Sequence, residues 1–364
     1  MDIIRRNFFR LLRSGAFDES EQIEPMSAWK WQRVYQYAMM HGVAALLYQG
    51  IVRCQQQFFL QIPPSLMAQW EKTVSDIKQE NVKNNLHITE LFALMGRMQL
   101  RPVLLRGQGM SILYDTPLLH TPEGIDVFFP YETQGKKADQ WAWDNGMNVD
   151  DNGNLTYEWQ QTIVTHHHRL VRLSNHIHSR TLHSIVEKEF RESSPTFLTI
   201  DGMRIEQLSP TLTLLHMLLA NTCHLLNDGV QLNLLVDLGV FLRKMGDKVD
   251  YVKLQSWIAR LRMKNVVQLT GTLLIELFAF SREELPFMSG GKSNTQLVME
   301  ELFNQRPSYE WHFQQGNDIF VHTANSSAMF WQVRHTARYF RYYPTESTTN
   351  LFTSFAHSLS HIEE

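Results

Sequence analysis

The chain has 364 residues, a formal net charge of −3 and 43% hydrophobic residues, a composition typical of a globular protein of two or three domains. This small net charge gives no electrostatic reason to expect a nucleic-acid partner. The two cysteines form no Cys-x-x-Cys pair, and no apolar run approaches the ~18 residues of a membrane helix, so we expect a cytoplasmic protein without a membrane partner.

The first hundred residues have the apolar spacing of helices. Residues 2–14 predict an amphipathic helix with Asp2 as its N-cap, and their arginines are scattered among apolar residues, which does not indicate a signal peptide. Another helix is expected from Ser27, and a long one over 64–99, opened by two prolines. We therefore expect an N-terminal helical region over residues 1–100.

The next stretch predicts a strand, a glycine turn and a short helix. Residues 102–105 are a brief apolar run that ends at Arg106 and Gly107, and helical spacing begins at Gln108. Backbone amides that follow a glycine turn of this kind can receive phosphate oxygens. The stretch is thus a candidate phosphate-binding element.

A second apolar run, residues 124–129, contains a single carboxylate, Asp126. Because side chains of a strand alternate, Asp126 should point to the face opposite its apolar neighbours. Strand carboxylates beside a glycine turn are the arrangement that holds a magnesium nucleotide. Glu123 lies three positions earlier and should face the other way on a regular strand, unless a bulge at Gly124 re-aims it.

This order of elements resembles the uncharacterised nucleotidyltransferase family, within the nucleotidyltransferase-like superfamily. In that family a Lys-Gly turn precedes an arginine and then an Asp-Ile-Asp strand. Here Arg106-Gly107 stands at the Lys-Gly turn, His120 at the arginine, and Gly124-Ile125-Asp126 at the acidic strand. The turn is kept, and one of the two strand carboxylates is replaced by glycine.

The resemblance implies an α+β fold, with a small mixed β-sheet of nucleotidyltransferase type embedded in a mostly helical protein. The sheet would lie in a core over residues 101–207, followed by a C-terminal helical domain over 208–364. It also implies transfer of a nucleoside monophosphate from an NTP to an acceptor, with Mg²⁺ as cofactor. Asp126 would be the catalytic metal ligand, and the implied nucleotide-binding residues are Arg106, Gly107, Gln108 and His120.

Further β-structure is expected after the acidic strand. A helix is predicted over 132–143, followed by a turn at 150–154 between two strands. Residues 155–164 and 169–173 are strand candidates, and residues 196–206 predict a hairpin with Asp-Gly at its tip.

The histidines of this region have two interpretations. His166 with His168, and His176 with His178, alternate so that a strand would place each pair on one face, where imidazoles can bind zinc or line a polar surface. The family often has its third carboxylate two residues before a histidine. We place that position at His176, which is therefore a candidate catalytic base.

The C-terminal half begins with Leu-Ser-Pro and continues with histidine-rich and Leu-x-Asp-Leu helices, an order that also resembles the family. His216, His224 and Asp237 are candidates for a polar cluster between these helices, or else for hydrogen-bonded core groups.

One carboxylate of three is a poor set for two divalent ions, which need several anionic oxygens. We therefore expect a nucleotidyltransferase-like protein that is weakly active or inactive and binds a nucleotide. Two alternatives remain. One is an active transferase that takes carboxylates from Glu123, Asp115 or Glu158, and the other is a non-enzymatic scaffold or metal-binding module that uses the histidine-rich sheet.

Overall fold

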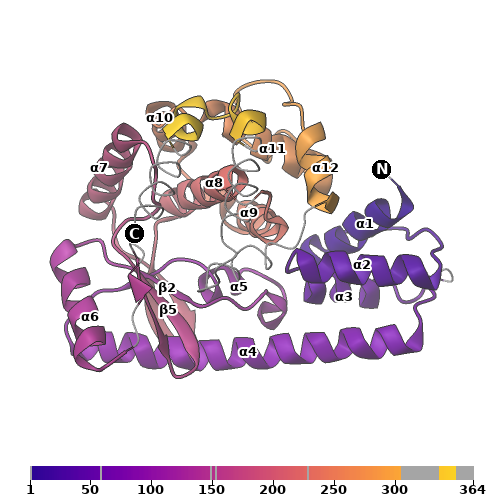
Figure 1. Ribbon diagram of the computed structural model, residues 1–364, viewed down its shortest axis with the longest axis horizontal. Helices are drawn as coiled ribbons and strands as arrows, with labels where there is room; N and C mark the ends of the chain where they lie inside the picture. Colours follow the sequence, from indigo (N-terminus) through magenta and orange to yellow (C-terminus); the bar gives the residue numbers. More distant parts are fainter. Residues whose placement is uncertain are drawn as a thin grey trace, which may run out of the picture. The chain divides into compact units, whose positions relative to one another are not determined.

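The computed structural model describes residues 2–57, 60–147, 150–151, 154–227, 229–304 and 336–349. The described residues form α-helices and one mixed sheet, as expected for the α+β class (Figure 1). The helices are α1 (Ile3–Phe17), α2 (Ala28–Met40), α3 (Ala44–Arg53), α4 (Pro64–Arg97), α5 (Gln108–Ser111), α6 (Glu132–Asp144), α7 (His176–Glu192), α8 (Pro210–Asn227), α9 (Leu232–Met245), α10 (Tyr251–Arg260), α11 (Lys264–Phe278) and α12 (Gln296–Asn304). The strands are β1 (Val103–Leu104), β2 (Ile125–Phe128), β3 (Asp150–Asp151), β4 (Leu155–Trp159), β5 (Thr162–His167), β6 (Thr196–Ile200) and β7 (Met203–Gln207).

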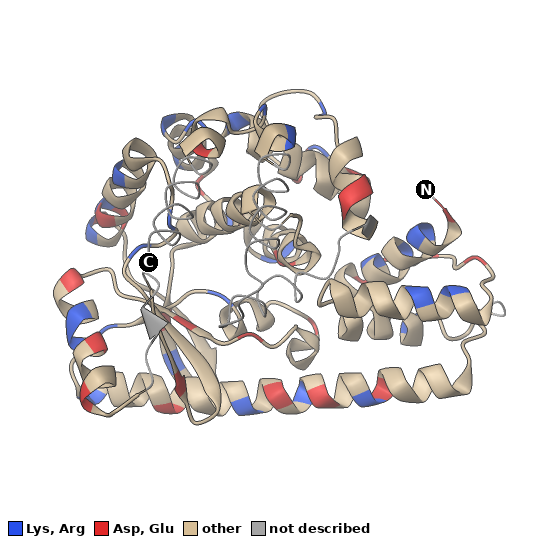
Figure 2. Ribbon diagram, in the orientation of Figure 1, with Lys and Arg blue, Asp and Glu red and all other residues tan. Residues whose placement is uncertain are grey.

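Two helices of the N-terminal region show why the sequence could place them. The side chain of Asp2 accepts a 2.9 Å hydrogen bond from the Arg5 amide, so it caps α1 as predicted. Helix α4 begins at Pro64 and ends at Arg97, close to the predicted range. Acidic and basic residues alternate along α4, so the helix carries no long run of a single sign (Figure 2).

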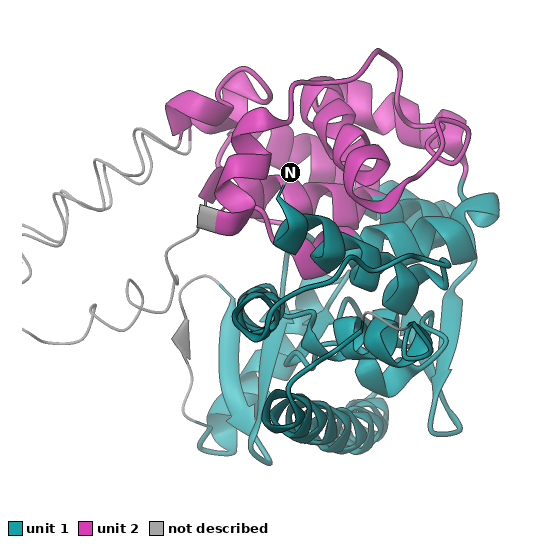
Figure 3. Ribbon diagram, turned by 90° about the vertical axis from the view of Figure 1, so that its right-hand side faces the viewer, with its two compact units in different colours: residues 1–170, 186–214, 236–249 teal, residues 171–185, 215–235, 250–364 magenta. Residues whose placement is uncertain are grey.

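The described residues form two compact units (Figure 3). The first contains the sheet and comprises residues 1–170, 186–214 and 236–249, and the second comprises residues 171–185, 215–235 and 250–364. The three consecutive segments expected from the sequence divide the chain differently and stay a prediction.

The sheet has the strand order β3-β4-β5-β2-β1-β7-β6. Strand β2 runs parallel to β5, with Asp126 opposite Thr165, and antiparallel to β1. Strand β1 is also parallel to β7, which forms the predicted hairpin with β6. Two segments of the chain are thus brought to either side of the acidic strand.

Two strand predictions are wrong. Residues 155–164 are not one strand but two, β4 and β5, because Gln160 and Gln161 adopt φ values of 50° and 63° and form the turn of a hairpin. Residues 169–173 are not a strand either. Glutamine is an uncommon residue in a left-handed turn, so the sequence contained no clear signal for this hairpin.

The strand expected around His176 is also wrong, because His176 is the first residue of α7. Asn175 accepts hydrogen bonds at its Oδ1 from the amides of Ile177 (3.0 Å) and His178 (3.2 Å), which is the geometry of an N-cap. On a helix, side chains two positions apart do not share a face, so His176 and His178 are not a pair.

The core of the first unit lies between one face of the sheet and helices α4 and α6. Ile125 and Val127 of β2 are buried there with Leu91 of α4 and Ala138 of α6. Asp126 alternates with these residues and therefore lies on the other face, as predicted. In the described part of the chain, none of the helices combines the length and the apolar character needed to cross a membrane.

Candidate functional site

Asp126 is bound by positively charged or donor groups at both carboxylate oxygens. Arg106 Nη2 lies 3.1 Å from Oδ2, and His167 Nε2 lies 2.5 Å from Oδ1. Burial by itself would raise the pKa of Asp126, but the His167 hydrogen bond and the Arg106 charge outweigh it and lower the pKa to about 2. The carboxylate is therefore ionised, and both of its oxygens are bound by side chains of the protein itself.

His167 was not identified from the sequence, and the register of the sheet explains its position. Asp126 lies opposite Thr165 in the parallel pair of β2 and β5, and Phe128 lies opposite His167. Thr165 and His167 are two positions apart, so they share the face of Asp126. Thr165 therefore lies beside Asp126 and two residues before a histidine, as the family's third carboxylate does. The sequence pattern places that position at His176 instead. His166, His167 and His168 are consecutive in the sequence, and only the strand pairing shows which of them lies on the face of Asp126.

Gly124 occupies the position of the missing strand carboxylate, and the structure leaves no room there for a side chain. A Cβ atom added to Gly124 would lie 2.6 Å from the backbone oxygen of Ile163 in β5. This is well inside van der Waals contact, and the obstructing atom belongs to the backbone. The glycine is thus required by the close approach of β5.

Glu123 precedes β2 and is not part of the strand, so the alternation argument that turned it away from Asp126 does not apply to it. Its Cβ lies 3.7 Å from the position that a Cβ on Gly107 would take. Burial raises the pKa of Glu123, and the charges of Arg106 and His120 oppose this increase. The carboxylate therefore lies beside the glycine turn and within electrostatic range of the Asp126 pair.

The glycine turn has the predicted form. Gly107 has φ 57° and ψ −117°, a conformation that favours glycine, and its carbonyl accepts hydrogen bonds from the amides of Met110 (2.9 Å) and Ser111 (3.0 Å). Gln108 is buried, and its Nε2 donates to the backbone oxygen (3.1 Å) and Oδ1 (3.0 Å) of Asn81. The side chain of Gln108 thus fastens the turn to α4.

His120 is buried against a carboxylate of α9. Its Nε2 lies 3.1 and 3.2 Å from the two oxygens of Asp237, and the Tyr114 hydroxyl donates a 2.5 Å hydrogen bond to the same group. Burial lowers the pKa of His120, but Asp237 outweighs this effect and raises it above its ordinary value. These contacts with His120 and Tyr114 join Asp237 to the glycine-turn region, and a polar cluster of Asp237 with His216 and His224 stays a prediction.

His166 and His168 do share a neighbour, as the alternating pattern predicts, and that neighbour is Asp139 of α6. His166 Nδ1 lies 2.9 Å from Asp139 Oδ1, and His168 Nε2 lies 2.7 Å from Oδ2. Burial lowers the pKa of His166. No group of three or more His, Cys, Asp or Glu side chains that could hold a metal ion occurs among the described residues.

The other two carboxylates considered from the sequence lie elsewhere. Asp115 forms ion pairs with Lys244 (2.8 Å) and Arg53 (3.9 Å). Glu158 is an exposed residue of β4, opposite Ile163 of β5. Neither is joined to Asp126 by any contact among the described residues.

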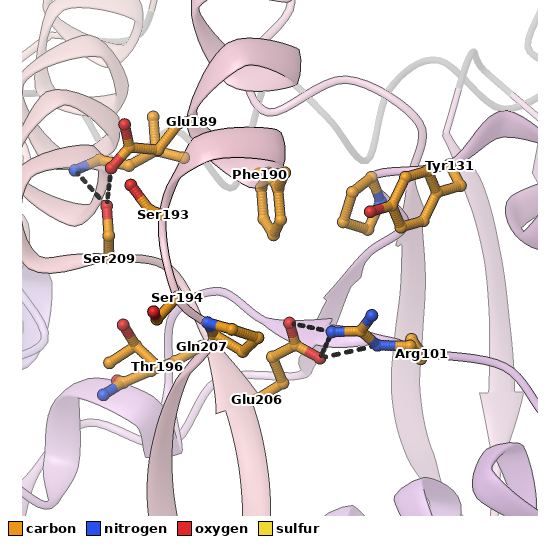
Figure 4. Close-up of a pocket in the computed structure, with 13 residues that line it drawn as sticks. Arg101, Tyr131, Glu189, Phe190, Ser193, Ser194, Thr196, Glu206, Gln207 and Ser209 are labelled. Atoms are coloured by element: carbon orange, nitrogen blue, oxygen red, sulfur yellow. Dashed lines mark hydrogen bonds and ion pairs between the residues drawn. The ribbon is translucent and has the colours of Figure 1, made fainter.

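A separate cavity of about 80 Å³ lies where α7 ends and β6 begins (Figure 4). Arg101 and Glu206 form an ion pair of 3.0 Å on one side of it, and the rings of Phe190 and Tyr131 lie on another (Figure 4). None of the site residues predicted from the sequence lines this cavity.

Comparison with protein families matches residues 27–279 to the model described as "Uncharacterised nucleotidyltransferase". A search of curated proteins finds no match. Among solved structures, the chain is similar to an antigenic nucleotidyltransferase-like protein from Paracoccidioides brasiliensis, with 12% identity and a TM-score of 0.33, over 55% of this chain and 92% of that one. The assignment of this chain to a family depends on the match to the family model. That match covers the glycine turn, the acidic strand and the helix of Asp237, and the chain belongs to the uncharacterised nucleotidyltransferase family.

Proposed function

We propose that this protein binds a nucleotide at the glycine turn and that its nucleotidyl-transfer activity is weak or lost. The observation that carries the proposal is the state of Asp126, whose two oxygens are bound by Arg106 and His167. A carboxylate held in this way is poorly available to a metal ion.

The residues around Asp126 do not fit the divalent metal that nucleotidyltransferases generally use. Hard divalent ions need several anionic oxygens at once, and the neighbouring positions hold Gly124 and Thr165 in place of carboxylates. The Gly124 position also has no space for a side chain. We therefore assign no reaction step to a metal ion in this protein.

Nucleotide binding is proposed from the glycine turn and its cation. Arg106 immediately precedes Gly107, and a guanidinium has five N–H donors, of which the bond to Asp126 uses one. The remaining donors suit phosphate oxygens, which arginine binds by charge and by hydrogen bonds. The ligand class is a nucleoside triphosphate, and its base and the acceptor are not specified by these contacts.

Calorimetric titration with ATP, GTP, CTP and UTP, each with and without Mg²⁺, tests this proposal. We expect binding of at least one nucleotide that depends little on Mg²⁺ and is lost in Arg106→Gln. Arg204→Gln is the matched control, because Arg204 of β7 lies over the ring of Phe197 of β6 and has no side-chain contact with the glycine turn among the described residues. Absence of binding to all four nucleotides would refute the proposal.

A second candidate is an active transferase in which Glu123 acts with Asp126. It is favoured by one observation, which is that Glu123 Oε2 is buried beside the glycine turn and has no hydrogen-bond partner among the described residues. Turnover of labelled NTP that requires Mg²⁺ and disappears in Glu123→Gln would replace the first candidate with this one. The metal-binding alternative is not supported, because the described ranges contain no group of three His, Cys, Asp or Glu side chains that could hold a metal ion.

A further inference from the structure

Three side-chain oxygens near the glycine turn are buried and accept no hydrogen bond from the described residues. They are Asn84 Oδ1, Gln108 Oε1 and Glu123 Oε2. Asn84 and Gln108 are only 2% and 4% exposed. Buried polar atoms without partners are rare in native proteins because they lose their hydration without compensation, so three in one region indicate a partner outside the described residues.

The orientation of both amide groups is determined by their nitrogen atoms. Asn84 Nδ2 donates a 2.9 Å hydrogen bond to the backbone oxygen of Glu123, and Gln108 Nε2 donates to the backbone oxygen of Asn81. A backbone oxygen can only accept, so exchanging nitrogen and oxygen in either amide would destroy these bonds. The two unpaired atoms are therefore acceptors and need a donor or a cation.

Several contacts place the three side chains in the same part of the first unit. Asn81, which binds Gln108, and Asn84, which binds the Glu123 backbone, are one turn apart on α4. Glu123 in turn lies against Gly107, the residue before Gln108. The oxygens thus belong to the small region enclosed by α4, the glycine turn and the segment before β2.

The charge of this region accommodates a cation. Its carboxylates are Glu123, Asp126 and Asp237, and its cationic or basic groups are Arg106 and the two histidines that bind Asp126 and Asp237. Even with both histidines protonated, the positive charges do not exceed the negative ones. A small cation therefore meets no net repulsion there.

We propose that Asn84 Oδ1, Gln108 Oε1 and Glu123 Oε2 bind one monovalent cation, K⁺ or Na⁺, beside the glycine turn. Two neutral amide oxygens and a single carboxylate supply the oxygen ligands that alkali cations take, with too little negative charge for a divalent ion. All three ligand oxygens belong to side chains of this chain, so this inference does not depend on the proposed function. A bound cation satisfies the three acceptors and fastens the turn to α4.

Thermal unfolding in KCl, NaCl and choline chloride at equal ionic strength tests the site. Ligand binding to the folded state alone raises Tm, so we expect Tm to be higher in KCl or NaCl than in choline chloride by at least about 3 °C. The difference should disappear in Glu123→Met and in Gln108→Met, which remove the ligand oxygens. It should persist in Glu158→Met, which removes an exposed carboxylate of β4.

Each variant is compared with itself in the three salts, so a general loss of stability does not hide the result. The ²⁰⁵Tl NMR signal of Tl⁺, a potassium mimic, provides a direct measure and should broaden with the native protein but not with Glu123→Met. Equal Tm values in all three salts would overturn the proposal and indicate a buried water or a proton on Glu123. A salt response that persists in both site variants would overturn it as well.

Discussion

Gly124→Ala tests the claim that β5 excludes a side chain from the position of the missing carboxylate. Replacement of glycine by alanine ordinarily stabilises a protein by about 0.4–1 kcal/mol, because it restricts the unfolded chain. At Gly124 the added Cβ would lie 2.6 Å from the Ile163 backbone oxygen and 3.4 Å from its carbonyl carbon. Strand β2 must then move away from β5, with which it pairs over four residues from Ile125 to Phe128.

The expected result is a loss of stability. Overpacking of this kind costs about 1–3 kcal/mol, which exceeds the ordinary gain, so we expect a net loss of about 1–2 kcal/mol. Urea denaturation followed by tryptophan fluorescence measures it. Gly96→Ala is the matched control, because no atom lies within 4 Å of a Cβ at that position in α4, and this variant should be as stable as the native protein or more stable.

Gly124→Asp applies the same stability test to the residue that the family has at this position. It restores the family's carboxylate in the sequence, but it contains the same Cβ and should be at least as unstable as Gly124→Ala. If Gly124→Ala proves neutral or stabilising, β5 does not exclude a side chain at this position, and the absence of the carboxylate has no steric cause.

Two further predictions concern pH. The pKa of Asp126 falls from 3.8 to about 2 on folding, so its ionisation adds roughly 2 kcal/mol to the free energy of unfolding above pH 4, and this contribution is lost as the pH falls toward 2. Asp126→Asn should therefore flatten the acid side of the profile of stability against pH. An unchanged profile would contradict the Arg106 and His167 contacts. His120 has the opposite sign, because its raised pKa makes its pairing with Asp237 stabilising below pH 6.5 and less so as the pH rises through the folded value. Urea denaturation at pH 6 and pH 9 should therefore show a larger loss for His120→Gln at the lower pH, and an equal loss at both would count against the charged pair.

Local features of the sequence were sufficient for many elements. Asp2 caps α1, Pro64 begins α4, and Gly107 forms the turn before α5, because each of these residue types has a conformational preference that acts within a few residues. The alternation around Asp126 likewise predicted its face correctly. The same kind of reasoning failed at Gln160 and at His176, where the turn residue was atypical and where the cap at Asn175 outweighed an apparent strand pattern.

Tertiary structure decided which residues contact one another in the site. His167 binds Asp126 from 41 positions away, because β2 and β5 are parallel neighbours in one particular register. Glu123 lies beside Gly107, and Asp237 of α9 binds His120, only because the fold brings these segments of the chain together. The sequence by itself therefore determined the glycine turn, the acidic strand and the loss of its second carboxylate. Which groups neutralise the remaining carboxylate, and why its neighbour must be glycine, depends on distances between strands that no local preference encodes.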